Sequence, residues 1–501
     1  MKAFLMYRDQ DFDLKGKLPW NEQALTQDLE LTTLFDAMAL GDKFLYDVAK
    51  KAVFSSLTVV ETILYRQNVL KDSLKNPSIL RQLYQIAVEA IEGERKLYWG
   101  FFRDHPHTIL QRSIEALELF VRQLKKLRHI ADEHAHEFES RGFTALFAML
   151  QAELGDGYFL RVENHLRDLK FRGGALISAE LGQGNKGTDY RLRKRPEKKL
   201  TWMERLFGRK PPAFTYYIPE RDENGPRYLA ELQDRGINLV ANALGQSTDH
   251  ILSFFTMLRT ELAFYVGCVN LHKRLTQLGQ PTCFPVPVVL GERRCSYRGL
   301  YDVCLALRMN QEVTGNDGNA DKRDLVIITG ANQGGKSTFL RSVGLIQLMM
   351  QCGMFAPAEA FCADMCEGLF THYKREEDTT MESGKFDEEL GRMSEIVEHL
   401  TPHAMLLFNE SFAATNEREG SEIARQIVSA LLERRIKVFF VTHLYEFANR
   451  FSAKRTEGAI FLRAERLADG TRTFKLIEGE PLETSYGEDL YNRIFVSGRD
   501  N

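Results

Sequence analysis

From about residue 21 to about residue 170, apolar side chains recur every three or four positions, which is the repeat of an α-helix that buries one face. One such stripe runs over several turns and consists of Ile114, Leu117, Phe120, Val121, Leu124 and Leu127. Polar and charged residues occupy most of the positions between them. The pattern predicts long helices that pack on one another.

The helical pattern breaks near Gly173-Gly174. The chain then has further glycines, a proline pair at Pro211-Pro212 and short strand-like runs such as Phe214 to Ile218. We expect an insertion that contains β-structure and covers about residues 172–226. Helical spacing resumes from about Arg227 to Leu275, and Ile251 to Val266 is apolar nearly all round, which indicates deep packing.

Pro281, Pro285 and Pro287 mark a boundary after this helix. Beyond them, short apolar runs alternate with helical patterns, as they do in α/β domains. The predicted class is therefore α + α/β. A helical domain over 1–280 contains the insertion, and an α/β domain follows over 281–501.

The run GANQGGKS, from Gly330 to Ser337, lies between an apolar strand pattern at Leu325 to Ile328 and the helical pattern that begins at Phe339. A glycine, four residues and then Gly-Lys-Ser is the pattern of a phosphate-binding loop. Its backbone N–H groups face an anion at a helix N-terminus. The predicted contacts to ATP come from Gly330, Ala331, Asn332, Gln333, Gly334, Gly335, Lys336, Ser337 and Thr338.

Within this loop we expect Lys336 to reach the β- and γ-phosphates and the hydroxyl of Ser337 to ligate Mg²⁺. Nucleotide hydrolysis also needs an apolar strand that ends in carboxylates, and Met405 to Glu410 fits that requirement. Glu410 is the predicted group that polarises water and, with Ser337, a predicted residue of the Mg²⁺ site. Asn409 is a predicted nucleotide-site residue at the position where an Asp would support the metal. The alternative is that Asn409-Glu410 only ends a core strand.

A third apolar strand, Val438 to Val441, is followed by Thr442-His443. A histidine at a strand end beside the γ-phosphate can hydrogen-bond to it, so His443 joins Glu410 and Lys336 as a predicted catalytic residue. By itself a histidine here would be an ordinary surface residue. Its place after the third strand is what favours the functional interpretation.

Composition bounds the setting of this site. The chain has 501 residues and a net charge of −3, so no overall basic field attracts nucleic acid. Its seven cysteines form no CxxC pair, which is typical of reduced thiols in a cytosol. The first residues carry charges where a signal peptide needs an apolar run, and no uninterrupted apolar stretch of membrane-spanning length stands out. We expect a cytoplasmic protein without a membrane segment.

Between Lys186 and Lys210 the insertion holds ten lysines and arginines against three acidic residues. Neutralising phosphates with such residues would make binding to DNA steeply salt-dependent. The candidate nucleic-acid contacts are Lys186, Arg191, Arg193, Lys194, Arg195, Lys198 and Lys199. The alternative is a solvated hairpin whose charges maintain solubility.

These stretches together resemble the MutS family of ATPases, which is related in fold to ABC-type ATPases. Thr329 to Thr338, TGANQGGKST, is similar to the family's TGPNMGGKST. Similar runs follow at Gln351 to Phe361, at Asn409 to Gly420, at Val441-Thr442-His443 and near the end at Ser485-Tyr486-Gly487. The resemblance covers about residues 285–495. A weaker one extends to the helical half, at Asp28 to Asp42 and Glu61 to Asp72.

The resemblance implies a homodimer with two nucleotide sites at its interface, where Ser383-Gly384 of one subunit contacts ATP held by the other. It also implies an ATP-driven clamp on DNA, in company with other repair or recombination proteins. The chain begins directly in the core helices, so we expect a short member that lacks the mismatch-recognition and connector domains. Asn409 and the residues after Ser383-Gly384 depart from the family's pattern, and Asn409 casts doubt on the hydrolysis rate.

Three functions follow from these patterns. The first is an ATP-binding and ATP-hydrolysing protein that acts on mismatched, branched or recombination-type DNA. The second keeps the ATPase but directs it to RNA, a ribosome or a protein partner. The third is a scaffold that binds nucleotide with little turnover. The adenine contact stays open among Tyr297, Tyr301 and Val313.

Overall fold

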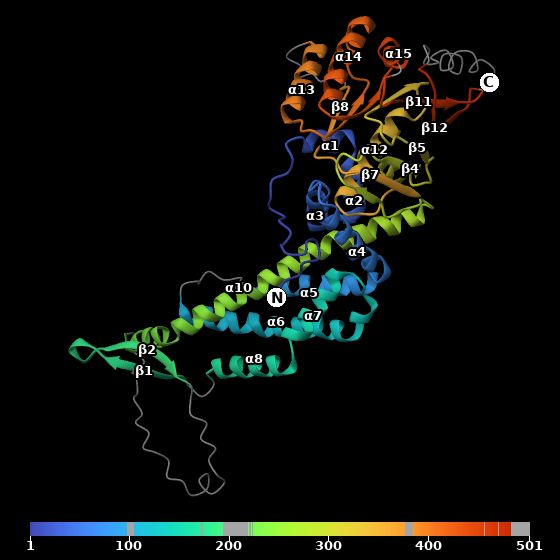
Figure 1. Ribbon diagram of the computed structural model, residues 1–501. Helices are drawn as coiled ribbons and strands as arrows, with labels where there is room; N and C mark the ends of the chain where they lie inside the picture. Colours follow the sequence, from blue (N-terminus) through green and yellow to red (C-terminus); the bar gives the residue numbers. More distant parts are fainter. Residues whose placement is uncertain are drawn as a thin grey trace, which may run out of the picture. The chain divides into compact units, whose positions relative to one another are not determined.

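The computed structural model describes residues 1–97, 105–171, 174–193, 219, 222, 224–375, 384–454, 456–468 and 470–481. The chain divides into two compact units. The first comprises Met1–Ala3, Gln82–His136 and Ala145–Arg259, and the second comprises Phe4–Arg81, Glu137–Thr144 and Thr260–Asn501. Figure 1 follows the chain through both, and each unit is considered separately below.

The first unit is built from helices. They are the greater part of α5 (Pro77–Leu97), α6 (Pro106–His134), most of α7 (Arg141–Glu153), α8 (Asp156–Leu169) and the first two-thirds of α10 (Asn224–Gln277). The apolar stripe predicted from Ile114 to Leu127 is buried on α6, where Phe120 packs against Phe255 of α10 with ring centroids 5.5 Å apart. The predicted helices are thus confirmed, and α10 is slightly longer than expected.

A two-stranded antiparallel hairpin lies inside the predicted insertion. It consists of β1 (Leu176–Leu181) and β2 (Gly187–Arg193), joined by the short 3₁₀ turn η2 (Gln183–Asn185). Ile177 lies against α10 at Gly236, where an added Cβ would come within 2.6 Å of the Ile177 side chain. The strand-like run predicted from Phe214 to Ile218 lies outside the described residues.

The second unit begins with shorter helices, α1 (Glu22–Asp28), α2 (Leu31–Ala39), α3 (Lys43–Val53) and α4 (Val60–Lys75). The last part of α10 joins them. There the buried carboxylate of Glu261 accepts hydrogen bonds from the backbone N–H groups of Leu5, Met6 and Phe12. Burial raises the pKa of Glu261 to about 7. These contacts fix the N-terminal segment to the unit's core.

A six-stranded sheet forms the centre of the second unit, in the order β12-β11-β6-β10-β9-β8. The strands are β6 (Leu325–Gly330), β8 (Leu369–Tyr373), β9 (Met405–Asn409), β10 (Lys437–Val441), β11 (Ala459–Arg466) and β12 (Arg472–Glu478). Neighbouring strands are parallel, except that β12 runs antiparallel to β11. The three strands predicted from the sequence are β6, β9 and β10.

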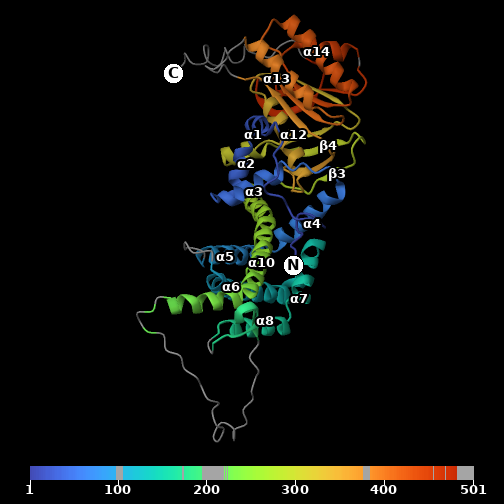
Figure 2. The ribbon, with the colours of Figure 1, turned by 90° about the vertical axis from the view of Figure 1, so that its left-hand side faces the viewer.

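Helices cover both faces of this sheet. On one face α13 (Lys385–His399), α14 (Glu417–Glu433) and α15 (Tyr445–Ala453) share an apolar core with Leu406 and Phe408 of β9 (Figure 2). Leu407 lies between these two residues, so it points to the opposite face. There it contacts α12 (Lys336–Gln351) at Gly344. Strand runs buried on both sides are near-continuous apolar sequences, which is why the three strands were recognisable.

A second, four-stranded sheet has the order β3-β7-β4-β5. It is formed by β3 (Val286–Val288), β4 (Cys295–Leu300), β5 (Asn316–Asn319) and β7 (Ala360–Asp364), and the short helix α11 (Val303–Met309) follows β4. Helices and sheets in this arrangement agree with the predicted α + α/β class. The predicted domain limits at 1–280 and 281–501 stay a prediction, although α10 ends at Gln277 and β3 starts only at Val286.

One helix, α10, is long and apolar enough to span a membrane by length and composition alone. In its most apolar window the mean hydropathy is 1.3, and 67% of that window is buried inside the protein. Apolar residues that already pack against other parts of a protein serve its core. This burial agrees with the deeply packed helix expected at Ile251 to Val266, where Phe255, Leu258 and Leu262 are buried.

Candidate nucleotide site

Three predicted motifs end side by side at one edge of the six-stranded sheet. In the parallel ladder, Val441 of β10 is level with Ile328 of β6 and with Asn409 of β9. The ladder continues past the strand ends, where the N–H of Thr442 donates to the Ile328 carbonyl (3.0 Å) and that of Glu410 to the Val441 carbonyl (2.9 Å). The carboxyl ends of parallel strands are where ligands bind in open α/β sheets.

The predicted phosphate loop connects β6 directly to α12. Gly330 and Gly335 have φ values of +105° and +89°, which a side chain disfavours. At Gly334 an added Cβ would lie 2.6 Å from the Cβ of Ala464 and 2.9 Å from the carbonyl oxygen of Ala331. The glycines therefore allow the loop to turn tightly against β11. Asn332 and Gln333 are exposed at its tip.

Lys336 is the first residue of α12, and its side chain is 5% exposed. Its ammonium group donates to the carbonyl oxygens of Gly330 (2.9 Å) and Ala331 (3.0 Å), so it folds back under the loop. Burial lowers the pKa of Lys336 to about 8, and the nearby carboxylate of Glu410 opposes this shift. Phosphate oxygens are strong acceptors for such an ammonium group and would favour its charged form.

This depressed pKa predicts that ATP binding takes up a proton at alkaline pH. Below about pH 7 the free protein already carries the charge. Between pH 8 and 10 the free protein has lost it in part, whereas bound phosphate restores it. We expect the affinity for ATP to be about tenfold lower at pH 9 than at pH 7. Calorimetry at pH 8.5 in buffers of different ionisation enthalpy measures the proton uptake directly, and equal apparent enthalpies in all buffers would contradict it.

Ser337 and Asn409 face one another across the ends of α12 and β9. The Ser337 hydroxyl donates to the Asn409 side-chain oxygen at 2.9 Å. Mg²⁺ prefers oxygen ligands and usually retains several water molecules beside phosphate oxygens. Two neutral oxygens at the end of the loop, with the Glu410 carboxylate next in the chain, fit such an ion. Asn409 supplies an oxygen there but no charge.

Glu410 follows β9 in a left-handed backbone conformation, with φ at +55°. This turn brings its carboxylate to 2.9 Å from Nε2 of His443, and both side chains are one-third exposed. The hydrogen bond from His443 is the main cause that lowers the pKa of Glu410, and the ammonium of Lys336 lowers it further. A half-buried, ionised carboxylate at the strand edge is suited to accept a proton from water.

A buried network that the sequence did not reveal holds the Glu410 turn from behind. The carboxylate of Glu389 in α13 accepts from the N–H of Phe412 at 2.6 Å. Nδ1 of His372 in β8 lies 2.8 Å from the Ser411 hydroxyl, which in turn donates to the carbonyl of His372 at 2.6 Å. Burial lowers the pKa of His372 to about 4, so its ring is neutral at physiological pH. The two residues after Glu410 are thus fixed by β8 and α13.

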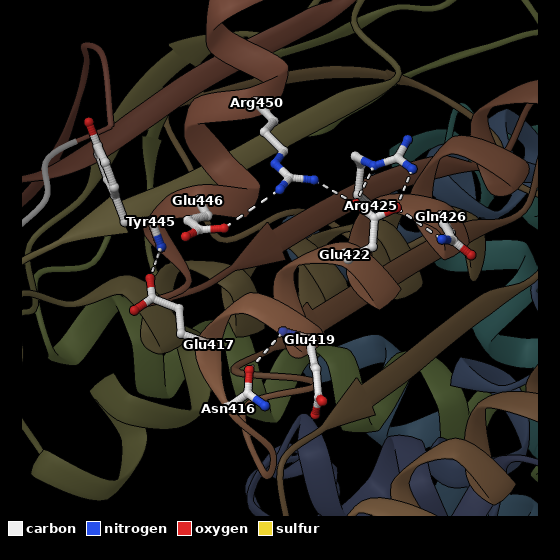
Figure 3. Close-up of polar contacts among 9 residues, drawn as sticks. All are labelled: Asn416, Glu417, Glu419, Glu422, Arg425, Gln426, Tyr445, Glu446 and Arg450. Atoms are coloured by element: carbon white, nitrogen blue, oxygen red, sulfur yellow. Dashed lines mark hydrogen bonds and ion pairs between the residues drawn. The ribbon is translucent and has the colours of Figure 1, made fainter.

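The helices that follow Glu410 and His443 are linked by surface contacts (Figure 3). The side chain of Asn416 caps α14 by accepting from the N–H of Glu419 at 3.0 Å. Glu417 accepts from the N–H of Tyr445 at 3.1 Å, and Arg450 of α15 pairs with Glu422 of α14 at 2.5 Å. Because α15 starts two residues after His443, these contacts set the spacing between the two strand ends.

A cavity of about 440 Å³ opens beside the phosphate loop. Gln333, Gly335 and Thr338 form its loop side. The other lining residues include Tyr301, Asp302, Met309, Val313 and Phe474. Its volume and mixed lining suit a small organic ligand. Two of the three predicted adenine candidates, Tyr301 and Val313, thus lie at this cavity.

The third adenine candidate, Tyr297, does not line this cavity. It is 7% exposed and packs against Phe339, with ring centroids 5.7 Å apart. Phe474 of β12, which no sequence motif indicates, is 53% exposed and lies close to Gly335. Its backbone has a φ of +61°. Because Phe474 is more than a hundred residues from the loop in sequence, only the pairing of β12 with β11 reveals it.

The remaining predicted site residues are placed in part. Gly384 is exposed directly before α13, whereas Ser383 lies outside the described residues, so the role of this pair in a second subunit stays a prediction. In the hairpin Lys186 is exposed, Arg191 pairs with Asp189 at 2.7 Å and Arg193 donates to Ser178 at 2.8 Å. The other candidates also lie outside the described residues, namely Lys194, Arg195, Lys198 and Lys199.

Comparison with known proteins places these elements in a family. Residues 58–278 match the family described as the MutS2 N-terminal domain, and residues 326–495 match MutS domain V. The DNA mismatch repair protein MutS of Thermotoga neapolitana is 32% identical over 178 residues, which are 35% of this chain and 22% of that protein.

The MutS proteins of two further organisms agree. That of Clostridium kluyveri is 27% identical over 238 residues, which are 46% of this chain and 27% of that protein. That of Thermus aquaticus is 31% identical over 167 residues, which are 33% of this chain and 20% of that protein. The matched part thus spans about a quarter of the length of these relatives. Matches to one family on both sides of the prolines, together with the loop and strand-end motifs, establish that the chain belongs to the MutS family.

Proposed function

We propose that the chain is an ATP-binding and ATP-hydrolysing P-loop protein of the ABC-like type that couples nucleotide turnover to DNA. One observation carries the proposal. Lys336, the Ser337–Asn409 pair and the Glu410–His443 pair lie at the ends of three adjacent parallel strands, beside a cavity of about 440 Å³. A triphosphate on the loop would extend past these groups, and its nucleoside would occupy the cavity.

Each residue then has a chemical role. The amides around Gly334 and the ammonium of Lys336 hold the phosphates and neutralise charge that develops during transfer. Ser337 and Asn409 would hold Mg²⁺, which supplies further charge neutralisation when bound. Glu410 accepts a proton from the attacking water, and the hydrogen bond from His443 keeps its carboxylate oriented and ionised.

We infer that the protein acts on DNA that is mismatched, branched or of a recombination type. We also infer that it works in the cytoplasm as a homodimeric clamp, together with repair or recombination proteins. Family membership supports this inference, because the matched relatives are named as DNA mismatch repair proteins. Lys186 is the described hairpin residue best placed to contact phosphates, since it is exposed near the turn.

Two observations are compatible with the alternative functions, a nucleotide-binding scaffold or an ATPase with another partner. Asn409 brings no negative charge to the metal, which favours a scaffold that binds ATP and turns it over slowly. Asp189 offsets the charge of Arg191, and the charges that remain on the hairpin would attract RNA or a ribosome as well as DNA, while a protein partner is the further alternative.

Phosphate release with a panel of nucleic acids tests the proposal. We expect duplex or branched DNA to stimulate turnover severalfold, and binding to weaken steeply between 50 and 200 mM salt. Replacing Lys186 with Ala should reduce the slope of log K against log salt by about one. Replacing Lys43, which is exposed on α3 of the other unit, should leave the slope unchanged. Stimulation by RNA alone would redirect the function, and absence of turnover under all conditions would favour the scaffold.

A further inference from the structure

Three consecutive residues, the last of α1 and the two that join it to α2, each contact a different part of the proposed nucleotide site. We call Asp28, Leu29 and Glu30 the α1–α2 corner. Glu30 has a φ of +54°, a left-handed conformation that is uncommon for a residue other than glycine, asparagine or aspartate. Strained backbone of this kind persists where surrounding contacts determine it.

Asp28 reaches the strand that leads to the predicted intersubunit loop. Its side chain is 1% exposed and pairs with Arg375 at 2.6 Å. Arg375 lies two residues beyond the end of β8, on the way from that strand toward Ser383-Gly384. The partner strand of β8 is β9, which ends at Asn409. Asp28 thus holds the residues that follow β8 in place, next to the end of β9.

Leu29 is fully buried between α12, the helix that follows the phosphate loop, and β9. An added Cβ at Gly344 of α12 would lie 2.8 Å from a methyl group of Leu29 and 2.9 Å from a methyl group of Leu407 in β9. The three residues are therefore in close contact. Leu29 helps to set the separation of α12 from β9, and hence that of Ser337 from Asn409.

Glu30 is linked to the wall of the cavity through Arg341. Its carboxylate pairs with Arg341 of α12 and, at 2.8 Å, with Arg308 of α11. The Arg341 guanidinium, 13% exposed, also donates to Asp302 at 2.5 Å. Asp302 is wholly buried, caps α11 through the N–H of Leu305 at 3.0 Å and lines the cavity. Helix α12, helix α11 and the cavity wall are thus joined to the corner by charged groups.

We propose that the α1–α2 corner positions the nucleotide site, so that ATP binding and the arrangement of α1 and α2 are coupled. Arg341–Asp302 is the most buried of these pairs, and loss of either partner would leave an uncompensated charge. The phosphate-loop helix, the cavity wall and the exit of β8 therefore shift as one set with the corner. Coupling of this kind is reciprocal. If ATP binding changes the arrangement of α1 and α2, then a change in that arrangement alters the affinity for ATP. The inference rests on the proposed nucleotide site.

Replacing Glu30 with Asn tests this coupling, because asparagine tolerates the left-handed conformation but removes the charge. We expect ATP affinity to fall by about fivefold or more, while turnover at saturating ATP changes less than twofold. The matched control is Glu22→Gln. It removes the half-buried Glu22–Lys50 pair (2.6 Å), which links α1 to α3 without reaching the sheet. This control should lower stability but leave ATP affinity unchanged.

Hydrogen exchange, compared with and without ATP within each protein, reports which segments ATP stabilises. In the wild-type protein, ATP should slow amide exchange in α1 and α2 as well as in the phosphate loop. In Glu30→Asn the slowing should persist in the loop and be lost in α1 and α2. If ATP protects the wild-type loop but not these helices, or if Glu30→Asn binds ATP as tightly as the wild type, the coupling is refuted. A wild-type protein that binds no ATP would instead refute the proposed function.

Discussion

Replacing Glu410 with Gln should reduce ATP turnover by about two to three orders of magnitude and leave ATP binding within about twofold of the wild type. The amide has the same size but cannot accept a proton from water. Gln can keep the left-handed turn, and the hydrogen bonds of the Ser411 hydroxyl and the Phe412 N–H do not involve the Glu410 side chain. Single-turnover phosphate release, together with equilibrium binding of ATP, separates the two effects.

The neighbouring residue provides the control for this experiment. Asn409→Asp is also a near-isosteric change at the end of β9, but it adds a charge next to Ser337 instead of removing one. If charge at the metal limits the rate, this variant should turn over ATP faster and at lower Mg²⁺ concentration. Undiminished turnover in Glu410→Gln would remove Glu410 from catalysis and direct attention to another base.

The site could be predicted from the sequence where its chemistry is local. The glycines and Lys336 follow one strand without interruption, and Asn409-Glu410 and His443 each follow another apolar run. Since parallel buried strands end at a common edge, three such runs place their terminal residues together. The strand bounds differ from the expected ones by only one or two residues.

Contacts between residues distant in sequence could not be predicted in this way. Glu30 and Arg341 are 311 residues apart, and neither lies in a pattern that suggests an ion pair. Phe474 reaches the cavity because β12 pairs with β11, which no local pattern specifies. A count of charges also does not show that Arg191 is paired with Asp189, which lies two positions earlier in the chain. Sequence patterns therefore identify the residues of the reaction better than the residues that position them.

Replacing Lys336 with Met should weaken ATP binding by about a hundredfold or more, because it removes the ammonium group that lies beneath the phosphate loop. In the free protein this group is held by the carbonyls of Gly330 and Ala331, so it is already in place before ATP arrives. Methionine retains much of the buried aliphatic stem, which keeps the loss of packing small. Arginine would retain the charge, but its planar guanidinium does not fit a pocket shaped for an ammonium group.

Thermal unfolding with ATP and Mg²⁺ measures this loss without labelled nucleotide. A ligand at a hundred times its Kd stabilises the folded protein by about 2.7 kcal/mol, and that stabilisation should all but vanish in Lys336→Met. Lys437→Met is the matched control, since Lys437 begins β10 at the opposite edge of the same sheet. It should keep the full ATP-dependent shift in Tm. Equal shifts in the wild type and Lys336→Met would mean that ATP, if it binds, is not held by this loop.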